Sequence, residues 1–228
     1  MALTEQAVSD ALKTVVDPNT GTDFVATRQL KNLRVDGGDV SFDVELGYPA
    51  KSQIPALRKL LIAAVRTLAG VDNVSANFTT KIIAHQVQRG VSLLPGVKNV
   101  IAVASGKGGV GKSTTTVNLA LALAAEGATV GILDADIHGP NIPKMLGVDD
   151  KKPLAAMGPV DGILPIETDH NLQVMSIGFF LNKEEDAVIW RGPMKHGVMK
   201  QFLGEVHWGS LDYLIVDLPP GTGDEALS

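Results

Sequence analysis

Residues 103–114 read VASGKGGVGKST and carry the strongest structural signal in this chain of 228 residues. The phosphate-loop pattern G-x-x-x-x-G-K-[ST] is satisfied by Gly106, Gly111, Lys112 and Ser113. Residues 100–104 are nearly all apolar, which predicts a strand buried on both faces, and a helix is predicted from about Ser113. This strand–loop–helix order would turn backbone N–H groups and a helix N-terminus toward phosphates. The stretch therefore predicts a nucleotide-binding domain, and it contains a lysine, Lys107, that the pattern does not require.

The loop also predicts which residues hold the nucleotide. Lys112 is expected to bridge the β- and γ-phosphates and to act in catalysis, while the Ser113 hydroxyl is expected to bind Mg²⁺. The full predicted nucleotide-binding set is Gly106, Lys107, Gly108, Gly109, Val110, Gly111, Lys112, Ser113 and Thr114.

A further metal ligand is predicted downstream. Residues 213–225, YLIVDLPPGTGDE, begin with an apolar strand that ends at Asp217, and ligands bind at the carboxyl ends of such strands. We expect Asp217 to bind Mg²⁺; the alternative is a turn aspartate ahead of the two prolines. Asp224 fits a helix N-cap as well as it fits a switch residue.

Two more carboxylates lie at the end of the strand predicted after the phosphate loop. In residues 133–141, LDADIHGPN, Asp134 and Asp136 are two positions apart, so they share a face of an extended segment. We expect Asp134 to steady the metal through a bound water and Asp136 to position the attacking water. The alternative is that the pair caps the next helix. His138 is expected to be a loop histidine without a catalytic role.

The second half of the chain alternates between strand and helix patterns. Apolar strand candidates lie at 129–136, 172–179 and 212–219, with a helix at 194–203. This alternation predicts an α/β domain with a doubly wound, mostly parallel sheet. Within VIWRGPMKHG, Arg191 fits a contact to phosphate or to a partner subunit. A helix start with Pro193 in its first turn explains the same residues, including Trp190 and Lys195, and both readings stay open.

The first 83 residues predict a separate, small α+β domain. Apolar side chains recur at helical spacing in two sets, Val8, Leu12, Val15, Val16 and Ile54, Leu57, Leu61, Val65, Leu68. Alternation predicts strands at 40–46 and 74–82, with a tight hairpin turn at DGGD. Asp17 and Asp23 are expected to be turn and cap residues. The predicted boundaries are a small domain at 1–86, a linker at 87–98 and the P-loop domain at 99–228.

Composition and charge exclude several classes of protein. The sequence has no cysteine, so its own residues form no disulfide and no thiolate metal site. Residues 1–97 carry 10 basic and 9 acidic side chains (+1), and residues 98–228 carry 10 and 16 (−6), which gives the net charge of −5. No block is basic enough to favour nucleic acid. The N-terminus is not a signal peptide and no apolar run approaches the ~20 residues that span a bilayer, so we expect a cytoplasmic protein without a membrane partner.

Several motifs together resemble a known family. GKGGVGKST is similar to the deviant Walker A motif of the P-loop ATPases that include MinD, ParA, the arsenite-pump ATPase and nitrogenase iron protein. With DADIHGPN, WRGPMK and IVDLPPGTGDE, it resembles the Mrp/ApbC family of iron–sulfur cluster carriers. MinD- and ParA-type proteins share the first motif but not DIHGPN or WRGPM. The first 83 residues resemble the small MIP18-like domain often fused in front of Mrp-type ATPases.

This resemblance implies an ATP-hydrolysing homodimer that receives an iron–sulfur cluster, expected to be [4Fe–4S], and passes it from donors to apo-proteins. It also implies a role for Lys107, because the first lysine of this motif reaches across the dimer to the other subunit's nucleotide. Lys107 would then act like an arginine finger in trans. The alternative is a surface lysine in a glycine-rich loop.

The cluster ligands themselves are not in this sequence. Mrp-type carriers hold the cluster with a C-x-x-C pair beyond PPGTGD, whereas this sequence has no cysteine and ends at Ser228. We therefore expect the P-loop domain to be truncated and the cluster to bind only a longer chain. Two other functions stay open: a MinD/ParA-type positioning switch, and a targeting ATPase without a cluster. The sequence beyond Ser228 would separate the three.

Overall fold

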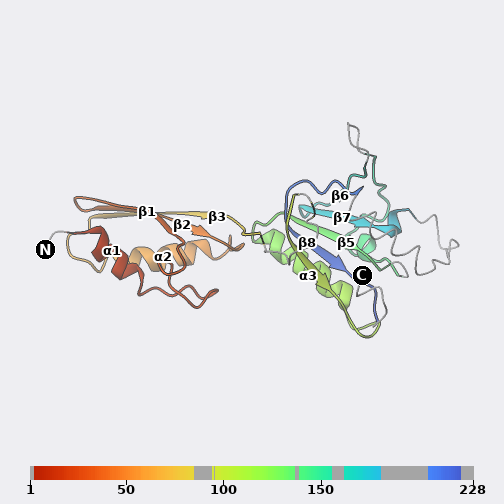
Figure 1. Cartoon of the computed structure of the whole chain (residues 1–228), viewed down its shortest axis with the longest axis horizontal. Coiled ribbons are helices and arrows are strands. Elements are labelled where there is room, and N and C mark those ends of the chain that lie inside the picture. The colour runs from red at the N-terminus through yellow and green to blue at the C-terminus, as the bar shows by residue number, and fades with distance from the viewer. Residues whose placement is uncertain are drawn as a thin grey trace. The chain divides into compact units, whose positions relative to one another are not determined.

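The computed structural model describes residues 3–84, 94, 96–136, 139–155, 162–180 and 205–221. The chain divides into two compact units, Met1–Ile83 and Ala84–Ser228, which Figure 1 shows in sequence colours. Buried apolar side chains form a separate core in each unit.

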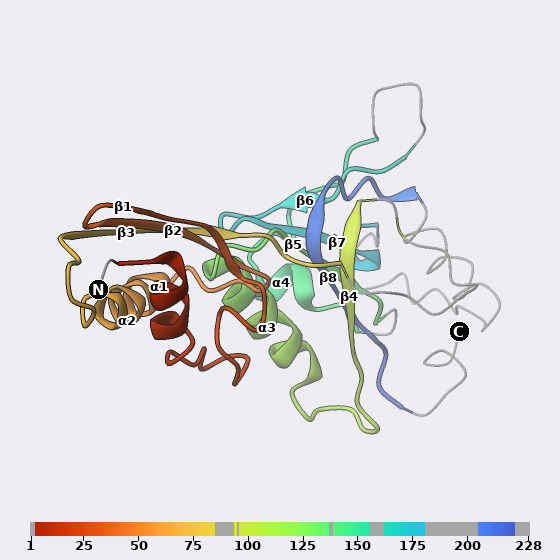
Figure 2. The same cartoon turned by 60° about the vertical axis from the view of Figure 1, so that its left-hand side comes forward.

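The first unit is a three-stranded sheet with two helices on one face, as Figure 2 shows. Its elements are α1 (Glu5–Leu12), β1 (Leu30–Asp36), β2 (Asp39–Leu46), α2 (Ile54–Val65) and β3 (Asn73–Thr80). β2 lies in the centre, antiparallel to β1 and parallel to β3. A parallel pair needs a crossover connection, which α2 supplies. The predicted small α+β fold is confirmed.

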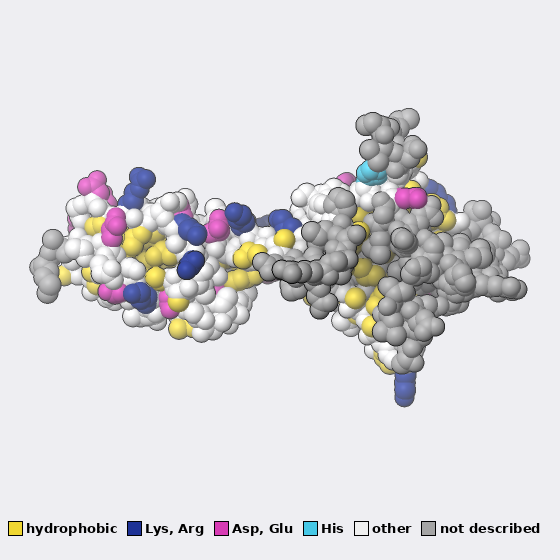
Figure 3. Space-filling model, in the orientation of Figure 1, with side chains coloured by type: hydrophobic (Ala, Val, Ile, Leu, Met, Phe, Trp, Pro, Cys, Tyr) yellow, Lys and Arg dark blue, Asp and Glu magenta, His cyan; other side chains and the backbone are white. Residues whose placement is uncertain are grey.

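The apolar pattern of the first unit explains its core. The alternating side chains of β2 that face the helices are fully or almost fully buried: Val40, Phe42, Val44 and Leu46. On α2 the buried face consists of Leu57, Leu61 and Val65. Gly37 turns the β1–β2 hairpin with φ of 59°, in the left-handed region that favours glycine. Figure 3 shows acidic and basic side chains interspersed on the visible face of this unit, in keeping with its small net charge.

The first helix is shorter than its apolar spacing predicts. α1 ends at Leu12, so Val15 and Val16 lie outside it, and Val16 is 55% exposed. Val16 instead forms a β-bridge with Asp23. The helix was expected to run up to Asp17 and Pro18, because proline disfavours helical backbone at the residue before it. The chain leaves the helix earlier, at Lys13, since the bridge from Val16 to Asp23 needs extended backbone there.

The two aspartates of this region hold local turns, as predicted. Asp17 is fully buried and accepts hydrogen bonds from the Asn19 backbone N–H at 2.9 Å and the Tyr48 hydroxyl at 2.7 Å. Burial and this bond to Asp17 raise the pKa of Tyr48 to about 12. Asp23 accepts from the backbone N–H groups of Val25 and Ala26, at 3.0 and 2.8 Å.

The second unit is a mostly parallel sheet, which confirms the predicted fold class. Its elements are β4 (Val97–Val103), α3 (Lys112–Ala125), β5 (Val130–Asp134), α4 (Ile142–Met145), β6 (Ile166–Glu167), β7 (Leu172–Ser176), the 3₁₀ turn η1 (Ile177–Phe179) and β8 (Leu211–Asp217). The strand order is β4-β8-β5-β7-β6. β4, β8, β5 and β7 are parallel, and β6 is antiparallel to β7.

The position of β8 determines where a ligand can bind. β8 comes last in sequence among these strands but lies between β4 and β5. Its register pairs Asp217 with Val103 on one side and with Asp134 on the other. α3 packs against β4, β5 and β8, and it begins where the carboxyl ends of these strands meet. This is the edge at which open α/β sheets bind their ligands.

β4 differs from its prediction in two respects. It was expected to be buried on both faces, but it is the outer strand at one end of the described sheet, and Val100 is 53% exposed. It also begins at Val97, before the strand predicted from residue 100, because Val97 already pairs with Leu211 of β8. The predicted helix at 194–203 lies outside the described residues. Within the described part of the chain, no helix is long and apolar enough to cross a membrane.

Candidate nucleotide-binding site

The loop between β4 and α3 is open and glycine-rich. Gly109 and Gly111 have φ of 74° and 89°, conformations that L side chains rarely adopt. A Cβ atom added at Gly106, Gly108, Gly109 or Gly111 would meet nothing within 4 Å. Gly111 occupies the N-cap of α3, so the N-cap residue offers no side-chain acceptor to the first N–H groups of this helix. These amides face an uncrowded space in which an anion can accept their hydrogen bonds.

Asp217 is the centre of the site. It is fully buried at the end of β8, and its Oδ2 accepts hydrogen bonds from the Lys112 ammonium at 2.5 Å and the Ser113 hydroxyl at 2.6 Å. Its Oδ1 accepts from the Thr116 hydroxyl at 2.6 Å. Three residues of the first turn and a half of α3 therefore bind a single carboxylate of β8. The sheet order explains this contact, since β8 pairs with β4, the strand that leads into the loop.

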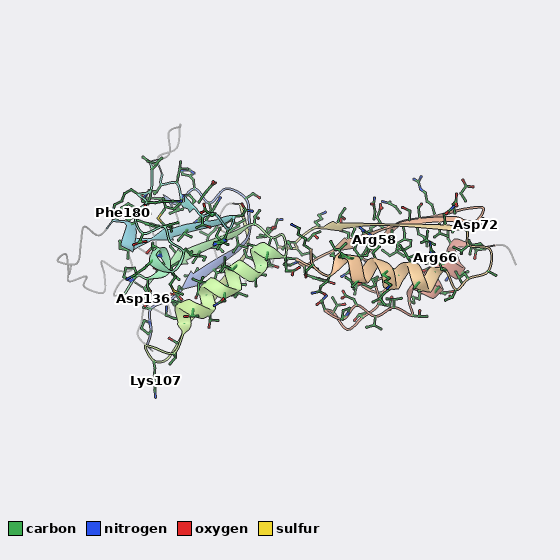
Figure 4. All side chains as sticks on the ribbon, turned by 180° about the vertical axis from the view of Figure 1, so that it is seen from behind. Arg58, Arg66, Asp72, Lys107, Asp136 and Phe180 are labelled. Carbon is green, nitrogen blue, oxygen red and sulfur yellow. The ribbon has the colours of Figure 1, made fainter. Side chains whose placement is uncertain are left out.

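Asp136 lies beside this centre, just after β5. Its Oδ2 is 3.7 Å from the Lys112 Nζ, and Figure 4 shows Asp136 at the end of the sheet where α3 begins. Its Oδ1 is buried and has no hydrogen-bond partner among the described residues. A buried acceptor without a donor is unusual in a folded protein, because desolvation without a hydrogen bond is unfavourable. This oxygen is therefore available to a donor brought in by a ligand or water.

Asp134 has a different environment. Its side chain is almost fully buried, and its Oδ2 accepts from the Ser176 hydroxyl at 3.0 Å and from the Ile142 backbone N–H at 3.3 Å. Its Oδ1 accepts from the Asp136 backbone N–H at 3.2 Å. Burial raises the pKa of Asp134 to about 7, and the nearby charge of Asp217 adds to the increase. The three hydrogen bonds act in the opposite direction and lower the pKa, but their effect is smaller. Both oxygens are engaged by local donors, so Asp134 links β5, β7 and the segment that holds Asp136.

Lys107 is not part of this cluster. It lies at the tip of the loop, and Figure 4 shows its side chain pointing away from the sheet. Within the part of the chain that the structure describes, its ammonium group has no carboxylate partner. The backbone nearby is fixed, because the Ser105 hydroxyl donates to the Lys107 carbonyl at 3.0 Å, and the Ser105 backbone carbonyl accepts from the Gly221 N–H at 2.8 Å.

The structure thus brings together Lys112, Ser113, Asp136 and Asp217, with Asp134 one step removed. Thr116 and Ser176 also contact the key carboxylates and were not predicted. Thr116 lies three residues after Ser113 on the same face of α3, a spacing that the sequence displays, but threonine there has ordinary helical explanations. The other candidates fall outside the described residues: His138, Trp190, Arg191, Lys195 and Asp224.

Several known proteins are similar to this chain. A nucleotide-binding protein from Archaeoglobus fulgidus, solved in complex with ADP, is 46% identical over 59% of this chain and 49% of its own, with a TM-score of 0.50. An iron–sulfur cluster carrier protein from Synechocystis is 43% identical over 99% of this chain and 64% of its own length. A cytosolic Fe–S cluster assembly factor from Yarrowia lipolytica is 51% identical over 59% of this chain and 46% of its length. The chain thus spans between about half and two thirds of the curated relatives it matches.

Two family matches divide the chain in the same way as the two units. Residues 5–78 match the family described as iron–sulfur cluster assembly protein. Residues 96–228, which include the glycine-rich loop and the Asp217 cluster, match the family described as NUBPL iron-transfer P-loop NTPase. The resemblance predicted from the motifs is confirmed, and the chain belongs to the family of iron-transfer P-loop NTPases.

Proposed function

We propose that this chain binds and hydrolyses ATP with Mg²⁺, and that its nucleotide state controls the transfer of an iron–sulfur cluster to apo-proteins in the cytoplasm. The observation that carries the nucleotide part is the cluster of Lys112 and Ser113 on the buried Asp217, beside an open glycine-rich loop. Support for the cluster part comes from the printed names of the relatives and from the family matches of both units.

The phosphates would be held by the loop and by Lys112. The N–H groups of residues 106–114 supply hydrogen-bond donors, and the Lys112 ammonium supplies the charge that faces the β- and γ-phosphates. Lys112 is mostly buried and held by Asp217 and Asp136. Its ammonium is therefore already positioned at the end of the sheet before a nucleotide arrives, and its side chain loses little freedom on binding.

The donor set beside Lys112 fits Mg²⁺. Magnesium prefers oxygen ligands, often one or two carboxylates together with substrate phosphates. The Asp217 carboxylate and the Ser113 hydroxyl are such ligands, and they lie 2.6 Å apart across α3 and β8. When bound, Mg²⁺ supplies positive charge that neutralises the charge developing on the phosphoryl oxygens. Asp217 and Ser113 are the residues that we propose to hold it.

Asp136 would orient the attacking water. Its buried Oδ1 accepts no hydrogen bond from the described residues, so it can accept one from water. Asp134 would act through Asp136, because it accepts the Asp136 backbone N–H and fixes the segment that carries the catalytic carboxylate. The metal role predicted for Asp134 remains a proposal, in which its carboxylate reaches the metal through water.

Lys107 would act on the nucleotide of a second copy of the chain. Its exposed position at the tip of the loop suits a residue that reaches outward, since a lysine that acted within its own site would lie near Lys112. Positive charge brought to the transferred phosphoryl group from a partner stabilises the transition state. A two-fold symmetric homodimer would complete both sites in this way.

The cluster is cargo whose ligands we expect in a longer form of the protein. This sequence has no cysteine, and thiolates are the usual ligands of such clusters. Anaerobic reconstitution of residues 1–228 with iron and sulfide should therefore give no cluster absorbance, whereas a longer chain with a C-x-x-C pair should give it. A cluster-loaded sample of residues 1–228 would contradict this assignment and point to histidine or carboxylate ligands.

The nucleotide assignment is tested by calorimetry. Lys112→Ala should abolish measurable ATP binding, because it removes the charge that holds the phosphates. Lys59→Ala is the matched control, since Lys59 is an exposed lysine on α2 of the first unit, and it should bind ATP as the wild type does. If Lys112→Ala bound ATP with wild-type affinity, the phosphate-loop assignment would be wrong.

A further inference from the structure

Thr116 makes a short hydrogen bond to the carboxylate at the centre of the site. Its Oγ1 lies 2.6 Å from Asp217 Oδ1, and both residues are fully buried. The same hydroxyl is 3.2 Å from the Lys112 carbonyl oxygen. A hydroxyl has one proton to donate, and the charged acceptor at the shorter distance is the stronger partner. The bond to Asp217 is therefore the principal interaction of this side chain.

The two oxygens of Asp217 have partners of different kinds. Oδ2 accepts from Lys112 and Ser113, whose polar groups the proposed function assigns to phosphate and to Mg²⁺. Nucleotide binding would redirect these two donors. Oδ1 accepts from Thr116, which has no part in binding the phosphates. The Thr116 bond is thus the one that can persist when the site is loaded.

We propose that Thr116 is a positioning residue: it fixes the rotation of the Asp217 carboxylate so that Oδ2 faces the metal. This inference rests on the proposed function, because it concerns the carboxylate that binds Mg²⁺ there. Without the hydroxyl, Oδ1 would be left buried without this donor, and the carboxylate would turn to find another one. Part of the free energy of metal binding would then be used to restore the orientation of the carboxylate, so Mg²⁺ would bind more weakly.

The position of Thr116 on α3 makes this role specific. It lies one helical turn after Lys112, and α3 packs directly on β8, so the distance between the hydroxyl and Asp217 is fixed by the backbone. Threonine in a helix has two main rotamers, and the one adopted here places Oγ1 within reach of both the Lys112 carbonyl and Asp217. Valine has nearly the same shape without the hydroxyl, and serine keeps the hydroxyl without the methyl group. The two substitutions therefore separate hydrogen bonding from packing.

The experiment compares wild type, Thr116→Val and Thr116→Ser by calorimetry with a non-hydrolysable ATP analogue, with Mg²⁺ and with EDTA. Thr116→Val should bind the analogue in EDTA within about twofold of wild type. The increase in analogue affinity on adding Mg²⁺ should be smaller than in wild type by about tenfold or more, which is the size expected for a hydrogen bond to a charged group. Thr116→Ser should keep the wild-type response to Mg²⁺. If Thr116→Val does not fold, Thr116→Ala takes its place, since it also lacks the hydroxyl.

The outcomes separate this inference from the function on which it rests. If wild type does not bind the analogue, the proposed function and this inference both fail. If wild type responds to Mg²⁺ and Thr116→Val responds equally, the positioning role is overturned and the nucleotide site stands. An equal loss of affinity by Thr116→Val with and without Mg²⁺ would show a merely structural role and would also overturn the inference.

Discussion

At the scale of single residues, the three carboxylates at the carboxyl ends of β5 and β8 have three different environments. Asp217 accepts hydrogen bonds from Lys112, Ser113 and Thr116. Asp136 keeps one buried oxygen without a partner among the described residues. Among the described residues, Asp134 accepts hydrogen bonds from neutral donors, and its pKa is raised to about 7, with burial as the largest cause. The three carboxylates at this edge of the sheet thus differ in their hydrogen-bond partners.

The raised pKa of Asp134 predicts a pH dependence of stability. Between its unfolded pKa of 3.8 and its folded pKa of about 7, the folded state keeps a proton that the unfolded state loses. Asp134 therefore stabilises the fold most below pH 3.8, and this contribution is lost as the pH rises toward 7. Asp134→Asn removes the titration, so its unfolding free energy relative to wild type should increase by up to about 4 kcal/mol from pH 4 to pH 8.

This prediction is checked by urea unfolding across that pH range. Both tryptophans of the sequence, Trp190 and Trp208, belong to the second unit, so their fluorescence follows this unit alone. Asp169→Asn is the control, because Asp169 is exposed. The unfolding free energy of this variant should change with pH as that of the wild type does. A constant difference between Asp134→Asn and wild type at every pH would contradict the prediction.

How well the sequence predicted the site depends on the kind of signal each residue gives. The phosphate-loop residues and Asp217 belong to motifs with fixed spacing, so their proximity could be predicted. Thr116 and Ser176 contact the carboxylates only because β8 lies between β4 and β5 and β7 lies beside β5. Strand order is a property of the whole sheet, and no local pattern around a threonine in a helix expresses it.

At the scale of elements, a polar network fixes the other end of the parallel sheet. Asp212 of β8 pairs with Lys98 of β4 at 2.6 Å, and it accepts from the backbone N–H and hydroxyl of Thr129, just before β5, at 2.9 and 3.0 Å. Burial opposes the ionisation of Asp212, but the bonds from Lys98 and Thr129 outweigh it and lower its pKa. Asp212 thereby fixes the register of β8 against both neighbours near the start of the strand, and Asp217 lies at the other end of the same strand, at the site.

Removal of Asp212 should therefore destabilise the second unit. Asp212→Ala leaves the Thr129 N–H and the Lys98 ammonium without this acceptor, which should lower the unfolding free energy by about 2 kcal/mol. The loss should be largest near neutral pH and should shrink as the pH falls through the lowered pKa of Asp212, because the wild type then loses the same interaction. Urea unfolding followed by tryptophan fluorescence measures this loss of unfolding free energy. Asp150→Ala, at an exposed aspartate, should behave as wild type; equal stability of the two variants would refute the prediction.

The elements themselves were predictable to different degrees. The alternation of β2 predicted its buried face because that sheet has helices on one side only. The apolar run of β4 predicted a strand but not its place in the sheet, since an outer strand and a central strand can share the same composition. The end of α1 was predicted too late, at Asp17 and Pro18, because apolar spacing continues past Leu12, whereas the bridge from Val16 to Asp23 depends on a contact that no local pattern expresses.

At the scale of the whole molecule, the two units have separate cores. The first core is built from α1, α2 and the sheet of β1 to β3, and the second from the parallel sheet and α3. Residues 1–86 alone should therefore fold and unfold cooperatively in urea, with dispersed amide signals by NMR. Unfolding of this fragment is followed by far-UV circular dichroism, because the fragment contains no tryptophan. A gradual, non-cooperative transition would mean that the first unit needs the second.

The last prediction concerns Lys107 and the dimer. Lys107→Ala should keep ATP binding nearly intact, because Lys112 and the loop amides remain, while hydrolysis should fall by ~10³-fold or more if Lys107 acts as a finger residue. Asp136→Ala should also lose hydrolysis, because the attacking water is left without its acceptor.

If each site takes Lys107 from one copy and Asp136 from the other, a heterodimer of the two variants has one site with both defects and one intact site. Mixing the inactive variants should then restore up to roughly a quarter of wild-type activity when subunits exchange freely. If Lys107 acted within its own site, every site would keep one defect, and the mixture would stay inactive.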